Sequence, residues 1–144
     1  MAGFNLDDFA LQDESNLDLR NKFGEPSGWI WTLAGPGHPA TVAADERLAK
    51  RNLAIQDEQE KARVNGRKWK GTGDSVDDVR ERNIDYIVAR LLRWSDGMTV
   101  EGSPFPCTPE NARKVLLNPG LGVYEQVNTY LLDEKSFTPR SPKT

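Results

Sequence analysis

Residues 84–105 read IDYIVARLLRWSDGMTVEGSPF, and residues 106–111 continue as PCTPEN. The apolar residues up to Trp94 recur at the three- and four-residue spacing of an amphipathic helix. Gly97 lies in a polar turn after that helix, and Thr108-Pro109 has the residue types that begin the next one. The side chains of this stretch suit packing and docking, and none of them is suited to chemistry.

Helical patterns extend in both directions from this stretch. Ser75 and Asp78 form a variant of the capping box, which predicts where the central helix begins. After Pro39 the chain is rich in helix-forming residues and contains no glycine or proline up to Val64. With an uncertainty of about three residues at each boundary, we expect helices over 39–64, 75–94, 108–117 and 121–133.

One segment has the pattern of a β-strand. Trp29, Trp31 and Leu33 alternate along residues 28–34, which glycine and proline close at positions 35–37. Because a lone strand is not stable, this segment needs a second strand, and residues 98–101 are the best candidate. The sequence therefore predicts a mainly α fold: a small helical domain with a minor two-stranded β element.

Both ends of the chain differ in composition from the middle. Residues 1–26 carry six acidic and two basic residues with apolar residues scattered among them. Such acidic and apolar mixing is typical of segments that are disordered, or that fold only on a partner. We expect a disordered acidic arm over 1–26, one helical domain over 27–137, and a disordered, proline-rich tail over 138–144.

Composition narrows the class of protein. The 144 residues carry a net charge of −3, with one cysteine and one histidine. One cysteine permits neither an intrachain disulfide nor a cysteine-rich metal cage. No apolar run approaches the length of a membrane span, and the first residues lack the pattern of a secretory signal. These features predict a soluble cytosolic protein.

The residues suited to catalysis are isolated from one another in the sequence. His38 lies in a Gly-Pro-Gly-His-Pro segment with no orienting partner nearby, so we expect a turn or capping role for it. Cys107 has no neighbouring base, and we expect it to be a small buried residue. No phosphate-binding loop or zinc-ligand spacing is present. The sequence predicts a protein that is not an enzyme and that binds no cofactor or metal.

A basic cluster surrounds Trp69 between Lys61 and Lys70. Cations with an interleaved aromatic residue are typical of single-stranded nucleic-acid sites. However, the chain as a whole is acidic, which favours a solvated loop or a docking site for an acidic protein segment.

The central helix is also expected to supply the core. Ile87, Leu91 and Trp94 lie on its apolar stripe, and Phe105 should pack near Trp94 across the turn. If Leu91 is a core residue, its replacement by alanine should cost about 2–5 kcal/mol.

The order of these features resembles the small tail assembly chaperones of long-tailed bacteriophages and prophages. In that family a helix ending near a tryptophan, a Gly-x-Pro-Phe turn and a Thr-Pro-Glu-Asn helix follow one another. Here these features are Trp94, residues 102–105 and residues 108–111. The resemblance extends over residues 27–137, and its sharpest part is 84–113.

The resemblance implies a mainly helical, non-enzymatic protein of virion assembly in the host cytoplasm. It would bind the tape-measure protein and keep it soluble until tail tube subunits polymerise, with the major tail tube protein as a further candidate partner. Self-association stays open. The alternatives are a permanent head–tail connector or tail-completion protein, and a nucleic-acid-binding phage regulator. The candidate partner-binding residues are apolar or aromatic: Phe4, Phe9, Leu11, Trp29, Trp31, Trp69, Trp94 and Phe105.

Overall fold

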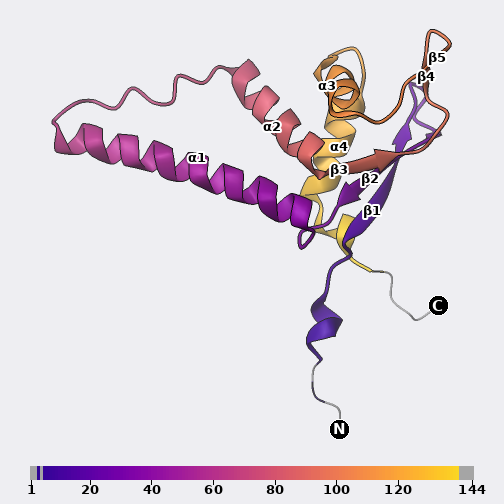
Figure 1. The fold of residues 1–144 in the computed structure, drawn as a ribbon, viewed down its shortest axis with the longest axis horizontal. Helices are drawn as coiled ribbons and strands as arrows, with labels where there is room; N and C mark the ends of the chain where they lie inside the picture. Colours follow the sequence, from indigo (N-terminus) through magenta and orange to yellow (C-terminus); the bar gives the residue numbers. More distant parts are fainter. Residues whose placement is uncertain (1–2, 4, 140–144) are drawn as a thin grey trace.

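Two antiparallel sheets and four α-helices make up the described part of the chain, which is residue 3 and residues 5–139 of a computed structural model (Figure 1). The larger sheet has three strands and the smaller has two. The predicted mainly α fold with a minor two-stranded element is therefore wrong. The chain has an α+β fold, in which helices cover one face of an antiparallel sheet.

The larger sheet has the order β1 (Glu14–Arg20), β2 (Pro26–Ala34) and β3 (Leu91–Trp94). Across it Leu17 pairs with Trp31, and Trp31 pairs with Trp94. The predicted partner of the tryptophan strand, residues 98–101, does not pair with it. That segment instead contains β4 (Thr99–Val100), which forms a short hairpin with β5 (Ser103–Pro104).

The N-terminal region predicted to be disordered contains the first strand. Leu17 and Leu19 point into the protein while Asp18 is exposed, so acidic residues occupy the solvent face of an ordinary half-buried strand. The prediction followed the acidic composition and overlooked this alternation. Before β1 lies a short 3-10 helix, η1 (Leu6–Phe9). Of the predicted C-terminal tail, residues 140–144 lie outside the described residues.

Three of the predicted helices agree with the structure within the stated uncertainty. These are α1 (Pro39–Val64), α3 (Pro109–Leu117) and α4 (Val123–Leu132), and a second 3-10 helix, η2 (Glu134–Phe137), follows. His38 caps α1 as expected, because its Nδ1 accepts the Ala40 N–H at 3.0 Å. At the start of α2 (Val76–Arg90), Ser75 and Asp78 exchange hydrogen bonds of 3.0 and 3.1 Å, which completes the predicted capping box.

The predicted end of the central helix is wrong. α2 stops at Arg90 and the chain continues directly into β3, where Leu91 pairs with Leu33 and Arg93 with Thr32. No glycine or proline marks this junction. Pairing with β2 therefore outweighs the helix propensity of Leu91–Trp94, an example of tertiary context overriding a local preference.

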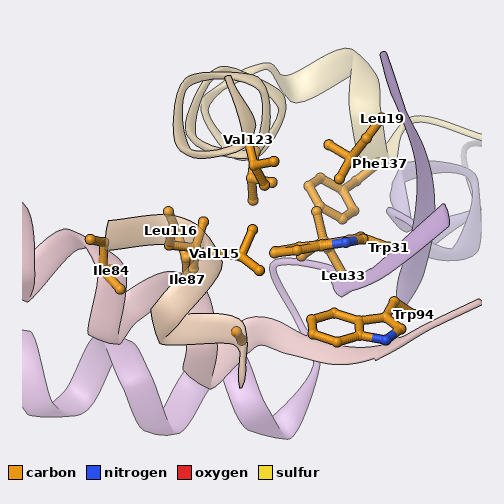
Figure 2. Close-up of a cluster of buried hydrophobic side chains, with 12 residues drawn as sticks. Leu19, Trp31, Leu33, Ile84, Ile87, Trp94, Val115, Leu116, Val123 and Phe137 are labelled. Atoms are coloured by element: carbon orange, nitrogen blue, oxygen red, sulfur yellow. The ribbon is translucent and has the colours of Figure 1, made fainter. Parts of the chain in front are cut away.

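The core lies between the larger sheet and the last three α-helices. Figure 2 shows side chains of the sheet facing side chains of the helices in one cluster. The predicted burial of Ile87 and Trp94 is confirmed, with 2% and 8% of each residue exposed. Leu91 is only half-buried, so its truncation should cost less than a full core position would. Phe105 stacks on Trp94 as expected, with ring centroids 5.7 Å apart.

The other face of the larger sheet is polar. Thr32 donates a hydrogen bond to Asn16 at 2.7 Å, and Arg93 forms an ion pair with Glu14 at 3.0 Å. This arrangement of one apolar and one polar face is typical of an antiparallel sheet that helices cover on one side.

Side chains of α4 satisfy the outer edge of β1. The Gln126 amide accepts the Arg20 N–H at 2.8 Å and donates to the Arg20 carbonyl at 3.2 Å. The Tyr130 hydroxyl donates to the Asn16 carbonyl at 3.2 Å. At Asn16 and Arg20, main-chain groups of this edge strand therefore have partners in α4.

Candidate functional site: an apolar groove

The β4–β5 hairpin, the start of β2 and the end of α3 surround a groove of about 440 Å³. Val100 and Leu121 lie on its rim and are 49% and 44% exposed. Lys114 and Asn118 contribute its polar atoms. The apolar residues that line the groove are Trp29, Met98, Val100, Phe105, Val115 and Leu121.

The hairpin forms one wall of the groove. Val100 pairs with Ser103, and the two residues between them, Glu101 and Gly102, have φ values of 52° and 81°. Positive φ at both positions is the geometry of a type I′ turn, whose twist matches that of the paired strands. At the base of the hairpin the Phe105 N–H donates to the Met98 carbonyl at 2.9 Å. Met98 and Phe105 are therefore held side by side.

Packed aromatic rings form the base of the groove. Trp29 meets Trp94 edge to face with ring centroids 5.2 Å apart, and the Trp94 indole N–H donates to the Phe105 carbonyl at 3.3 Å. Trp31 lies 5.3 Å from Trp94 on the core side. Such aromatic pairs add stability beyond the burial of their area. The base of the groove is therefore ordered without a bound partner.

The structure brings four of the eight candidate residues into one aromatic cluster: Trp29, Trp31, Trp94 and Phe105. Trp29 and Phe105 line the groove, and Trp94 supports them from underneath. Trp31 is fully buried in the core, so its side chain does not reach the surface.

The remaining candidates are elsewhere. Trp69 is half-buried on the loop between α1 and α2, and Phe9 and Leu11 are exposed on the N-terminal segment, at 68% and 45%. Phe4 lies outside the described residues.

Sequence reasoning missed several groove residues as candidate contacts. Met98 and Val100 were assigned to a strand paired with residues 28–34, which would have buried them. The helix predicted over 121–133 places Leu121 only at a helix start. The one local signal was the Glu101-Gly102 turn, because a two-residue turn between short apolar strands is typical of a hairpin.

Cys107 and His38 are the two residues considered for catalysis. The surroundings of Cys107 fit a packing role, and those of His38 fit helix capping. Burial raises the pKa of the Cys107 thiol, which is opposite to the shift that activates a cysteine nucleophile. His38 uses its Nδ1 atom to cap α1. Over residue 3 and residues 5–139, no three histidine, cysteine or acidic side chains gather where they could hold a metal ion.

No helix within the described part of the chain combines the length and apolar character needed to cross a membrane. Comparisons with protein-family models, with curated proteins and with solved structures find no match to this chain. Its function must therefore be inferred from its own residues and geometry.

Proposed function

We propose that this chain is a tail assembly chaperone of a long-tailed bacteriophage or prophage. In this proposal it works in the host cytoplasm, without catalysis, and keeps the tape-measure protein soluble until the tail tube polymerises. Two features support it: the resemblance over residues 84–113, and the groove, to which the hairpin of that same stretch contributes three lining residues.

The apolar groove is the observation that carries the proposal. A groove with two exposed aliphatic residues at its rim and aromatic rings in its floor fits the apolar face of an amphipathic helix. Its volume of about 440 Å³ accommodates a few side chains. Such an interface is of modest area, so binding should be reversible, as release to the assembling tail requires.

The exposed N-terminal segment is proposed to assist. In the sequence Leu6 precedes and Phe9 follows the pair Asp7-Asp8, and both apolar residues are more than half exposed. They offer further apolar contacts beside charges that keep the free protein soluble. A truncation that tests this role should remove residues 1–11 only, because residues from Glu14 onward form β1 and Gln12 donates to the Phe137 carbonyl.

Co-expression with the tape-measure protein tests the groove. Wild-type chain should raise the soluble yield of that protein, and Val100→Asp should abolish the gain, because a carboxylate at the rim opposes apolar docking. Leu53→Asp is the matched control, since Leu53 is 63% exposed on α1 and does not line the groove. Melting curves of the isolated variants check that each remains folded.

Two outcomes would contradict the proposal. If no tail protein becomes more soluble, the chaperone function is excluded. If washed virions contain the chain in stoichiometric amounts, a head–tail connector or tail-completion protein is the better assignment.

A further inference from the structure

The far end of α1 and the loop after it carry a concentrated positive charge. Residues 61–70 read KARVNGRKWK, with five cations and no acidic residue. Because the whole chain has a net charge of −3, the other residues carry −8. We call residues 61–70 the basic tip. Figure 1 shows this end of α1 pointing away from both sheets.

The basic tip has a defined shape because hydrogen bonds fix where α1 ends. The Arg67 N–H donates to the Ala62 carbonyl at 2.8 Å, and the Gly66 N–H donates to the Arg63 carbonyl at 3.2 Å. These are the two hydrogen bonds of a Schellman motif, with Gly66 in the left-handed conformation at φ 65°. The chain therefore reverses sharply at the tip.

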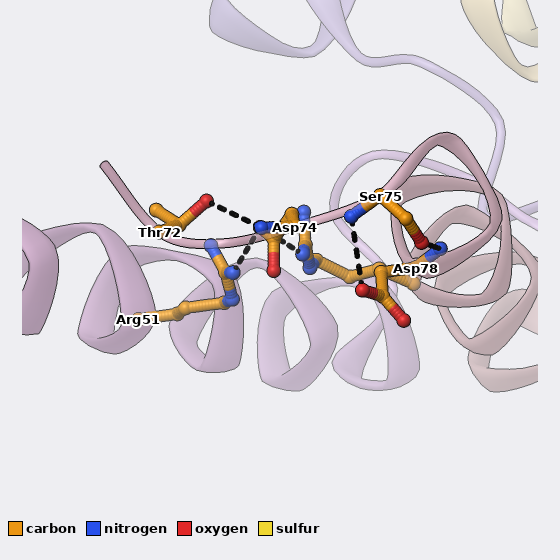
Figure 3. Close-up of polar contacts among 6 residues, drawn as sticks. Arg51, Thr72, Asp74, Ser75 and Asp78 are labelled. Atoms are coloured by element: carbon orange, nitrogen blue, oxygen red, sulfur yellow. Dashed lines mark hydrogen bonds and ion pairs between the residues drawn. The ribbon is translucent and has the colours of Figure 1, made fainter. Parts of the chain in front are cut away.

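The loop is also held at its other end. The Asp74 carboxylate binds Arg51 of α1 at 2.7 Å and Arg82 of α2 at 2.6 Å, and the Thr72 hydroxyl accepts the Asp74 N–H (Figure 3). With both ends fixed, residues 67–73 present their side chains from a loop that is partly ordered in advance. Such preorganisation reduces the cost of binding a partner.

Three cations of the basic tip lack a carboxylate partner. Lys61 pairs with Asp57, and Arg63 with Glu60, inside α1. Arg67, Lys68 and Lys70 are exposed and form no ion pair with any residue in the part of the chain that the structure describes.

Trp69 lies among these cations and is half-buried. It shares a hollow of about 640 Å³ with residues of α1, including Gln56, Gln59 and Glu60, and the carboxylate of Glu60 is paired with Arg63. The hollow therefore combines an aromatic surface, amide groups able to bond a peptide backbone, and positive charge along its border.

We propose that the basic tip binds an acidic protein segment that carries at least one apolar side chain. Carboxylates of the partner pair with Arg67, Lys68 and Lys70, and the apolar side chain packs on Trp69. This is a second docking site, separate from the apolar groove and of different chemistry. Nucleic acid fits less well, because a long polyanion would extend over a body of net charge −8.

A peptide titration of the full-length chain tests the proposal. The probe is a short fluorescent peptide of glutamate and serine with one leucine, and its control has glutamine in place of glutamate. The wild-type chain should bind only the glutamate peptide, more weakly as salt increases. The triple variant Arg67→Gln, Lys68→Gln and Lys70→Gln should bind the peptide about tenfold or more weakly. Each exposed ion pair contributes little to the affinity, and the variant removes three of them at once. Trp69→Ala should weaken binding and leave the salt dependence in place.

The matched control removes three exposed cations elsewhere, through Lys22→Gln, Lys50→Gln and Lys135→Gln, and should keep wild-type affinity. Equal weakening by both triple variants would mean that net charge alone acts, and would overturn the proposal. Tighter binding of a single-stranded oligonucleotide with the same charge as the peptide would also overturn it. Val100→Asp should not change peptide binding, so failure here is distinguishable from failure of the groove.

Discussion

The carbonyl oxygen of Ala34 accepts hydrogen bonds from two helices. Arg90 of α2 donates to it through Nε at 3.1 Å and Nη2 at 2.7 Å, and the Thr41 hydroxyl of α1 donates at 3.4 Å. Arg90 is only 7% exposed, and the rings of Tyr86 and Phe137 flank its guanidinium at 5.6 and 5.4 Å. A buried charge is costly unless it is hydrogen-bonded, and these contacts supply the compensation. The Ala34 carbonyl thus links the end of β2 to both α1 and α2.

Gly35, the next residue, allows two chain segments to approach closely. A Cβ atom added there would lie 1.9 Å from the Gln12 carbonyl oxygen, and the Gly35 N–H donates to the Asp13 carbonyl at 2.7 Å. Gly35→Ala must therefore push backbone apart, and we expect it to lower the free energy of unfolding by about 1–3 kcal/mol. Denaturant unfolding measures this. Gly37→Ala is the control, because a Cβ there meets nothing within 4 Å. Equal stability of the two variants would contradict the prediction.

Among the elements, the link between α1, α2 and their loop should depend on pH. The Thr72 hydroxyl first, then Arg82 and Arg51, lower the pKa of the Asp74 carboxyl. A carboxyl whose pKa is depressed by folding stabilises the folded loop above its unfolded pKa of about 4. That stabilisation is lost as the pH falls through the folded pKa. Acidification below about pH 4 should therefore release the loop.

The indole N–H signal of Trp69 in NMR spectra reports this release. In the wild-type chain it should move toward its position in the Asp74→Asn variant as the pH falls through this range. Asp57→Asn, which changes an exposed acid elsewhere on α1, should titrate like the wild-type chain. A Trp69 signal in Asp74→Asn with the same pH dependence as wild type would show that Asp74 does not hold the loop.

The elements that were predicted correctly are those whose signals lie within a few residues of one another in the sequence. The caps at His38, Ser75 and Thr108 act through hydrogen bonds to residues two or three positions away, and these helix starts are confirmed. The prediction missed β1 because the acidic composition of residues 1–26 hid the alternation of Leu17 and Leu19. It missed β3 because this strand depends on pairing with β2, some sixty residues away in sequence. The groove was found only in part for the same reason. Trp29 and Phe105 are conspicuous aromatics, whereas Met98, Val100 and Leu121 become neighbours only when hairpin and helix meet.

At the scale of the whole molecule, the two proposed docking chemistries lie at separate ends. The groove is apolar and adjoins the packed core, while the basic tip projects on α1 beyond it (Figure 1). α1 is buried only near its start, at Thr41 and Ala44, and its far half contacts mainly its own loop. Local stability should therefore decrease along the helix.

Hydrogen exchange tests this gradient. Amides of residues 53–64 should exchange well before those of β2 and of the first turns of α1, because opening the far half of the helix exposes little apolar surface. Exchange measured by residue-resolved NMR at neutral pH gives the comparison directly. Uniform protection along all of α1 would mean that the helix opens as one unit with the core.

The hydrogen bonds between Gln126 and Arg20 have a consequence for the synthesis of the chain on the ribosome. The strand is synthesised early, while the amide that satisfies its edge lies 106 residues later. Until α4 emerges, the Arg20 main-chain groups lack this partner, and an unpaired strand edge is prone to pair with another copy. Fragments that stop before residue 126 should therefore aggregate more readily than completed chains, in which Gln126 covers the Arg20 end of this edge.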